Sequence, residues 1–298
     1  MKKSYKIYLF ALLSMLFWGF SFVWTNIAYA HRYEPIMTIF IRLVISSLIL
    51  YLVIKLLKRE QKIERTDYGR FLLLAFFQPF LYFMGESFGL KIVTPTMAAV
   101  IICTIPLITP FFAYVFVKEK ITVLNFAGLV VSFTGILMMV ISSDFSFNAP
   151  PLGIILEFCA VMAAIFYSVA VKKLAHKYSS FTIIKVQNIL GAIYFLPLFL
   201  IFDFNQFITV KPDSELIFAI LMLAVFASSG AYLLYIPVVR ELGINKANMF
   251  TNFIPVFTAV TSFFVLSEAF DIKKIIGMAV VIAGVFISQI RKKLNVIT

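Results

Sequence analysis

The stretch AAVIICTIPLITPFFAYVFVKEKITVLNFAGLVVSFTG at residues 98–135 decides the fold, because its pattern returns at residues 247–284 as ANMFTNFIPVFTAVTSFFVLSEAFDIKKIIGMAVVIAG. In so apolar a chain, chance matches of Ala, Ile or Val carry little information, whereas a proline, a glutamate and two glycines in one register carry much. The sequence therefore predicts two copies of one apolar unit. The residues in register are Pro106, Thr109, Glu119, Gly128 and Gly135 in the first copy and Pro255, Thr258, Glu268, Gly277 and Gly284 in the second.

The composition indicates an integral membrane protein. Hydrophobic residues make up 62% of the chain, charged residues 13%, and the mean hydropathy is +1.01. Soluble domains are nearer 45–50% apolar and about 25% charged. The net charge of +12 comes from short Lys and Arg clusters between apolar stretches. We therefore expect the bilayer, and not a nucleic acid, as the partner of this chain.

Apolar runs long enough to cross a membrane occur ten times. A hydrocarbon core about 30 Å thick needs roughly 20 helical residues. We therefore predict an all-α integral membrane protein with ten transmembrane helices, arranged as two five-helix repeats over residues 1–145 and 146–298. The runs lie at residues 7–30, 35–57, 69–90, 94–117, 122–142, 152–172, 180–202, 215–239, 246–266 and 272–290.

The basic residues predict the orientation of these runs. Cytoplasmic loops of membrane proteins are enriched in Lys and Arg. If the N-terminus lies in the cytoplasm, most of the 26 Lys and Arg residues fall at cytoplasmic ends of the runs. Five helices per repeat is an odd number, so the second repeat is inverted relative to the first. We expect a multi-pass protein of the cytoplasmic (inner) membrane with both termini in the cytoplasm.

Several motifs together resemble those of one known family. Trp18-Gly19 lies in the first run, Pro35 and Arg42 lie in the second, and the Pro, Glu and Gly unit of residues 98–135 returns in residues 247–284. Over essentially its whole length the chain resembles the EamA family of the drug/metabolite transporter superfamily. The resemblance implies a ten-helix inner-membrane carrier, commonly an exporter of amino acids or related metabolites.

We therefore expect a secondary transporter that moves a small-molecule solute by alternating access around a central cavity, with export as the expected direction. Import, or another class of organic solute, stays open because an inverted repeat does not fix the direction. An enzyme is not expected, because a catalytic site within the membrane would need reactive side chains gathered at one depth. The two histidines, His31 and His176, fall at opposite ends of runs and on opposite sides of the predicted membrane. The sequence has no metal or nucleotide motif, so neither a metal nor a cofactor is expected. No pattern fixes the oligomeric state, and a monomer is compatible with it.

The repeated residues have structural readings beside functional ones. Glu119 and Glu268 each stand three residues before a helix-capping residue type, which fits a structural joint, with a gating ion pair as the alternative. The glycines, seven residues apart in each copy, predict close approach of neighbouring helices. The prolines predict bends that act as hinges or as static kinks. The glycines are Gly128, Gly135, Gly277 and Gly284, and the prolines are Pro106 and Pro255.

Polar stripes at helical spacing are candidates for the solute path, because polar groups facing lipid are costly. Hydrogen bonding between helices is the alternative reading. The path residues we predict are Trp18, Ser21 and Thr25 in the first run, Gln78, Tyr82 and Glu86 in the third, Tyr232 and Tyr235 in the eighth, and Asn248 and Asn252 in the ninth.

Three of the charged residues within the runs are candidates for a functional role. Glu86 is the first candidate for coupling to a proton or cation, and Glu157 is a second, although its place near the end of a run predicts that it reaches the outer surface. Arg42 is expected to pair with a carboxylate, to serve the architecture or to meet an anionic solute group. No cluster of Lys or Arg lies mid-run, as a phosphorylated solute would need. The sequence therefore favours a small neutral, zwitterionic or aromatic solute.

Overall fold

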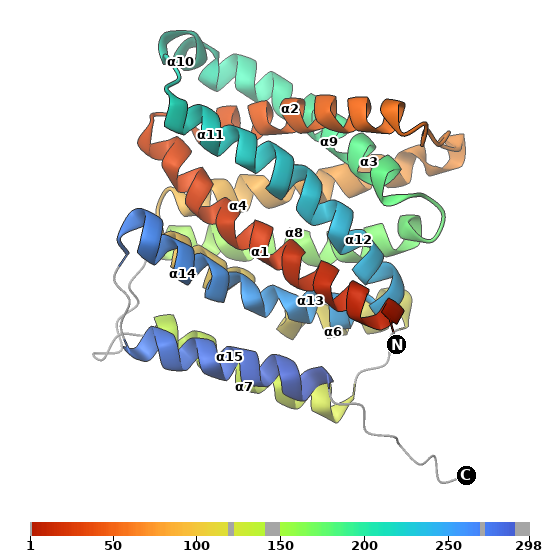
Figure 1. The fold of residues 1–298 in the computed structure, drawn as a ribbon, viewed down its shortest axis with the longest axis vertical. Helices are drawn as coiled ribbons and strands as arrows, with labels where there is room; N and C mark the ends of the chain where they lie inside the picture. The colour runs from red at the N-terminus through yellow and green to blue at the C-terminus, as the bar shows by residue number, and fades with distance from the viewer. Residues whose placement is uncertain (1, 119–121, 141–149, 269–271, 290–298) are drawn as a thin grey trace.

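The computed structural model describes residues 2–118, 122–140, 150–268 and 272–289, and each secondary-structure element in these ranges is a helix (Figure 1). In chain order the elements are α1 Lys2–Ala30, α2 Pro35–Leu56, η1 Arg65–Asp67, α3 Tyr68–Ala75, η2 Phe76–Leu81, α4 Tyr82–Leu90, α5 Pro95–Ile102, α6 Ile105–Val117, α7 Val123–Val140, α8 Pro151–Ala175, α9 Ser180–Leu198, η3 Phe199–Asp203, α10 Phe204–Thr209, α11 Ser214–Met222, η4 Leu223–Gly230, α12 Ala231–Leu242, α13 Ile244–Met249, η5 Phe250–Phe253, α14 Ile254–Leu266 and α15 Ile272–Gln289.

In the part of the chain that the structure describes, seven helical stretches are long and apolar enough to cross a membrane, and three shorter apolar helices accompany them. Each of the ten overlaps one of the runs predicted from the sequence, although some ends differ by several residues. The prediction of an all-helical, multi-pass membrane protein is confirmed. The long stretches are Tyr5–Ala30, Pro35–Leu56, Arg65–Leu90, Pro151–Ala175, Ser180–Thr209, Ser214–Leu242 and Ile244–Leu266, and the short ones are Pro95–Pro110, Phe126–Gly135 and Ile275–Gly284.

Three of the long stretches described here contain a π-helical segment, and two of these segments, η2 and η4, lie at related places in the third and eighth runs. In the third run, η2 separates α3 from α4, and Gln78 within it has non-helical backbone angles (φ −149°, ψ 118°). Pro79 follows Gln78 and explains the break, since proline has no N–H and its ring clashes with the preceding turn. In the eighth run, η4 separates α11 from α12. Breaks of this kind free backbone and side-chain groups to face the interior of the bundle.

Two other stretches are interrupted just before a repeated proline. A turn at Cys103 and Thr104 separates α5 from α6, and the 3-10 segment η5 separates α13 from α14. Pro106 and Pro255 then lie in the first turn of the following helix, where the missing N–H costs least. The Thr251 carbonyl, which Pro255 cannot bond, accepts from the Ile254 N–H and, at 2.9 Å, from the Cys103 thiol. The two breaks therefore touch each other across the bundle.

The repeated glycines lie where α7 crosses α15, at one edge of the bundle (Figure 1). A Cβ added to Gly135 would lie 2.6 Å from the Gly277 carbonyl oxygen, and one added to Gly284 would lie 2.5 Å from that of Gly128. These distances are too short for any side chain, so the two backbones are in direct contact.

The remaining helices surround the centre of the bundle. α1 packs against α12 and α14, α2 packs against α9, and α4 packs against α8. Because each of these pairs joins a helix from the first half of the chain to one from the second, the interior is lined by both halves.

Candidate functional site

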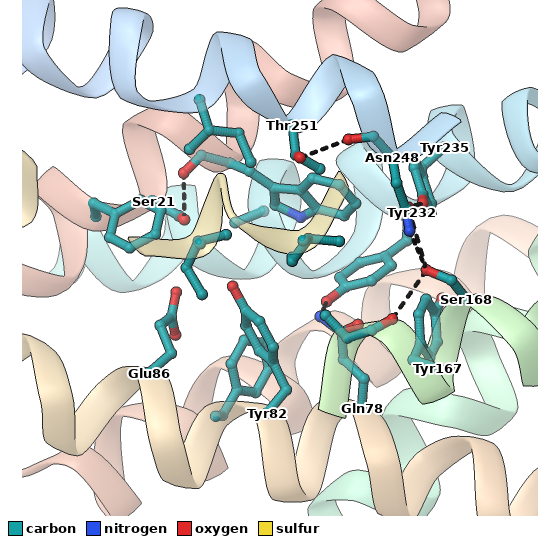
Figure 2. A pocket seen from close by; sticks show the side chains of 18 of the residues that line it. Ser21, Gln78, Tyr82, Glu86, Tyr167, Ser168, Tyr232, Tyr235, Asn248 and Thr251 are labelled. Carbon is teal, nitrogen blue, oxygen red and sulfur yellow. Dashed lines mark hydrogen bonds between the residues drawn. The ribbon is translucent and has the colours of Figure 1, made fainter. Parts of the chain in front are cut away.

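A cavity lies at the centre of the bundle, among α1, α4, α8 and α12 (Figure 2). The empty space between its walls is about 580 Å³ in total, but only about 40 Å³ is open to the centre of a water molecule. One water needs roughly 10–15 Å³ by that measure. The cavity therefore has room for a few waters in this conformation, and an organic solute would require the helices to move apart.

The wall of the cavity is mixed aromatic, polar and apolar. Its residues come from both halves of the chain, and several of them lie at the helix breaks described above. They are Trp18, Ser21, Phe22, Arg42, Gln78, Tyr82, Phe83, Glu86, Ile102, Ile105, Ala164, Tyr167, Ser168, Ala227, Tyr232, Tyr235, Asn248, Thr251 and Ile254.

Aromatic rings form one side of the cavity. The Trp18 indole of α1 packs against Tyr232 and Tyr235 of α12, with ring centroids 5.0 and 5.1 Å apart. Tyr167 of α8 meets Tyr232 edge-on at 6.0 Å. Such rings offer flat apolar faces together with hydroxyl and indole N–H groups, which suits a solute that has both apolar and polar parts.

Asn248 lines the cavity and is the centre of a buried hydrogen-bond network. Its Nδ2 donates to Thr109 Oγ1 at 2.9 Å, and its Oδ1 accepts from Ser168 Oγ at 3.2 Å and from the Tyr235 hydroxyl. Thr251 Oγ1 donates to the Asn248 carbonyl at 2.6 Å (Figure 2). One side chain of α13 thus connects α6, α8 and α12, and a change in any of them changes the shape of the cavity.

Gln78 connects the break in the third run to the opposite half of the chain. Its Nε2 donates to the Tyr232 hydroxyl. Gln78 of η2 and Ala227 of η4 both line the cavity, so these two π-helical segments border the same space. Interrupted helices near the middle of a membrane protein are typical of ion and solute sites.

One cation and one carboxylate border the cavity. The Arg42 guanidinium stacks 3.7 Å from the centre of the Phe83 ring, and its Nε has no hydrogen-bond partner among the described residues. Glu86 points into the cavity from α4, beside Tyr82 (Figure 2). Among the described residues, Glu86 Oε2 accepts a long hydrogen bond of 3.5 Å from Ser87 Oγ. Among the residues that the structure describes, no group of three or more His, Cys, Asp or Glu is placed to hold a metal ion.

The structure brings most of the predicted path residues into this cavity. Trp18, Ser21, Gln78, Tyr82, Glu86, Tyr232, Tyr235 and Asn248 line it. Thr25 and Asn252 are buried but lie outside the lining of this cavity, so their place in the path stays a prediction. Tyr167, Ser168 and Thr251 also line the cavity and are not in the predicted path. The adjacent Tyr167 and Ser168, in an otherwise apolar run, were the signal that could have revealed two of them.

Glu157 does not reach the outer surface, contrary to the prediction from its place in the run. Its side chain is fully buried. The turn after α4 covers the start of α8, because Gly153 lets Val93 and Ile92 approach: a Cβ on Gly153 would lie 2.6 Å from Val93 Cγ1. Gly89 likewise lets α4 approach the Glu157 carboxyl group.

Of the two repeated glutamates, Glu268 lies in the described part of the chain. Glu268 follows the end of α14, and its Oε2 accepts from Thr96 Oγ1 of α5 at 2.7 Å. This contact joins the second half of the chain to the first. Glu119 and Asp271 lie outside the described residues, so the predicted capping roles are not seen in this structure.

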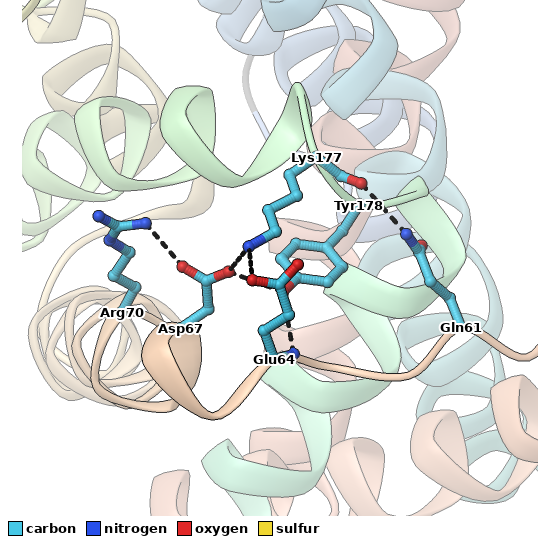
Figure 3. A network of polar contacts seen from close by, with 6 residues as sticks. All are labelled: Gln61, Glu64, Asp67, Arg70, Lys177 and Tyr178. Atoms are coloured by element: carbon cyan, nitrogen blue, oxygen red, sulfur yellow. Dashed lines mark hydrogen bonds and ion pairs between the residues drawn. The ribbon is translucent and has the colours of Figure 1, made fainter.

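A second polar network joins the two halves at the end of the bundle where α1 begins (Figure 3). Asp67, which is 1% exposed, accepts from Lys177 Nζ at 2.5 Å, from the Tyr178 hydroxyl at 2.7 Å and from the Arg70 guanidinium at 2.6 Å. Lys177 Nζ also pairs with Glu64 at 2.5 Å. These bonds to two carboxylates raise the pKa of Lys177. The segment between α2 and α3 is thereby fixed to the turn between α8 and α9.

Comparison with known proteins agrees with this architecture. The model of the EamA-like transporter family matches residues 5–141 and 151–289. A protein of Archaeoglobus fulgidus named an uncharacterized transporter is 27% identical over 282 residues, which is 94% of this chain and 97% of that protein. The uncharacterized transporter YetK of Bacillus subtilis is 24% identical over 85% of this chain and 78% of its own length.

A solved crystal structure of a protein shares the fold, with a TM-score of 0.77 over 95% of this chain and 97% of that one, at 15% identity. The family match covers nearly the whole chain, the matched relatives are named as transporters, and the helices are of membrane-spanning length. This protein is therefore a multi-pass membrane transporter that belongs to the EamA-like transporter family.

Proposed function

We propose that this chain is a carrier that moves a small neutral or zwitterionic metabolite, an amino acid or a related compound, through the central cavity by alternating access, with export as the net direction. The observation that carries the proposal is a central cavity at the helix breaks, lined by polar and aromatic side chains from both halves. Arg42 and Glu86 in the wall are suited to the carboxylate and ammonium groups of a zwitterion.

The two halves, residues 1–145 and 146–298, would act as inverted five-helix repeats with both termini in the cytoplasm. The packing supports this arrangement. If each run is exchanged for its counterpart, the α1–α12 contact becomes the α8–α4 contact, and the α2–α9 and α7–α15 contacts are each exchanged with themselves. Inverted repeats of this kind open a central site to one side or the other by exchanging the conformations of the halves.

Within this cycle, the conformation described here would be the occluded one, because the cavity leaves little room for a solute. The network around Asp67 would close the cytoplasmic end, since it ties a loop of the first half to a loop of the second. The breaks before Pro106 and Pro255 would serve as hinges, because they touch each other next to the cavity. Glu86 is the coupling candidate that the solute itself would meet.

Counterflow in proteoliposomes tests the proposal. Purified protein would be reconstituted with a panel of amino acids inside the vesicles, and entry of the labelled compounds measured. Tyr232→Phe removes the acceptor for Gln78 inside the cavity, whereas Tyr51→Phe is a matched control at an exposed position. We expect saturable exchange by the wild type and by Tyr51→Phe. The Tyr232 hydroxyl borders the cavity and would also bond to the solute. Loss of that bond, worth about 1–1.5 kcal/mol, should raise the apparent KM about tenfold in Tyr232→Phe.

Two results would reject the proposal in different parts. Folded wild-type protein that exchanges no member of the panel would reject this class of solute. Equal KM values for Tyr232→Phe and Tyr51→Phe would instead show that the solute does not bind in the central cavity.

A further inference from the structure

A buried carboxyl group lies behind the central cavity and is not part of its lining. Glu157 of α8 is fully buried, and neither of its carboxyl oxygens has a hydrogen-bond partner among the described residues. Its neighbour on α4 is Gly89: a Cβ on that glycine would lie 2.6 Å from Glu157 Oε1. The missing side chain at Gly89 therefore makes the space that the carboxyl group occupies.

Among the residues that the structure describes, Glu157 has another acid nearby and no ion pair with a basic residue. Glu86 lies one turn before Gly89 on the same helix and is close enough for its charge to act on Glu157. Tyr82 of α4 and Tyr29 of α1 lie near Glu157, and the Tyr29 hydroxyl donates to the Ser87 carbonyl. Arg42 acts on Glu86, Tyr29 and Tyr82 from α2 and stacks on Phe83.

An unpaired carboxylate in such a place is costly. An ionised carboxyl group buried without a partner loses many kilocalories of hydration, and in practice it takes up a proton instead. A second acid nearby adds to that cost, because two carboxylates at one site do not both ionise readily. Ionisable groups inside membrane proteins that lack a structural partner mark ion or proton pathways.

We propose that Glu157 is a proton-binding site, which holds one proton on a carboxyl oxygen in this occluded conformation. The proton would leave to water when α4 and α8 separate and the carboxylate becomes hydrated, and it would return from water when they close. The binding of the proton follows from the occluded structure alone, whereas its release rests on the proposed alternating access.

Infrared spectroscopy of the reconstituted protein tests proton binding without any solute. A protonated carboxyl group gives a C=O stretching band that a carboxylate lacks. We expect the wild type at neutral pH to show such a band, Glu157→Gln to lose it, and Glu34→Gln to keep it. Glu34 is a matched control because it is half-exposed and paired with Lys91. An unchanged band in Glu157→Gln, or no such band in the wild type, would overturn the proposal.

A second measurement covers the case in which Glu157→Gln fails to fold. Hydrophobic carbodiimides modify protonated carboxyl groups in apolar surroundings, so the wild-type protein would be treated with one and its peptides analysed by mass spectrometry. An adduct on Glu157 that disappears as the pH is raised supports the site. The absence of any adduct on Glu157 across the pH range contradicts it. Neither readout needs transport, so failure of the counterflow assay would be a separate result.

Discussion

Gly284→Ala tests the close contact between α7 and α15, which is the most direct structural consequence of the repeated glycines. The added Cβ would lie 2.3 Å from Ser132 Oγ, 2.5 Å from the Ser132 amide nitrogen and 2.5 Å from the Gly128 carbonyl oxygen. Two of these atoms belong to the backbone and cannot rotate away. The two helices must therefore separate, and the hydrogen bond from Ser132 Oγ to the Val281 carbonyl, now 3.2 Å, must lengthen.

The expected cost follows from two opposing effects. Forcing an extra methyl into a filled contact costs about 1–3 kcal/mol, whereas replacing glycine by alanine inside a helix gains about 1 kcal/mol. Gly69→Ala provides the matched control, because Gly69 lies in α3 with no atom within 4 Å of the added Cβ. It should show the gain alone. We therefore expect Gly284→Ala to be less stable than Gly69→Ala by about 1–3 kcal/mol.

Reversible unfolding in mixed micelles, with sodium dodecyl sulfate as the denaturant, measures this difference. The wild type and both variants would be followed by circular dichroism under identical detergent conditions. The reasoning is refuted if Gly284→Ala is as stable as Gly69→Ala, since the backbones of α7 and α15 would then have room for a side chain.

Three further changes have clear expectations. Asp67→Asn removes the charge that binds Lys177 and should therefore speed alkylation of a cysteine placed at Ala227 in the cavity. Glu215→Gln removes an exposed charge at the opposite end and should leave the rate unchanged. Equal alkylation rates in the two variants would show that the Asp67 network does not close the cavity. Asn248→Leu removes the centre of the buried polar network and should lower the free energy of unfolding by about 1–2 kcal/mol in the same micelle assay. The hydrogen bond from the Leu216 N–H lowers the pKa of Asp213. The ionised Asp213 therefore stabilises the fold above the ordinary carboxyl pKa, and this stabilisation is lost as the pH falls. The melting temperature should accordingly drop less on acidification in Asp213→Asn than in the wild type.

The sequence predicts the helices well because their length is set by the membrane. An apolar run of about 20 residues has few alternatives to a transmembrane helix. The interruptions are harder to predict. A proline marks the breaks at Pro106, Pro255 and Pro79. The segment η4 contains no proline, so no such residue in the sequence indicates that break. A run such as 215–239 therefore reads as continuous although the structure divides it.

The candidate site is predicted less completely because helical spacing gives a face but not its neighbour. Ser21 and Thr25 lie one turn apart on α1, yet only Ser21 borders the cavity, since the cavity ends between them. The prediction that Glu157 reaches the outer surface is wrong for a related reason. Its distance from the end of the run suggests the surface, but the turn that buries it comes from α4, far away in the sequence. Such contacts between distant segments become visible only in the folded chain.

The central cavity combines a symmetric frame with asymmetric chemistry. Ile102 and Ile105 hold the same places in the first repeat as Thr251 and Ile254 in the second, and all four line the cavity. The charged groups, in contrast, come from α2 and α4 of the first half, while the Asn248 network is centred in the second. In the proposed alternating access, such a frame would let the cavity open to either side. Because the chemistry is unequal, a bound solute would keep one orientation relative to the protein while access changes from one side to the other.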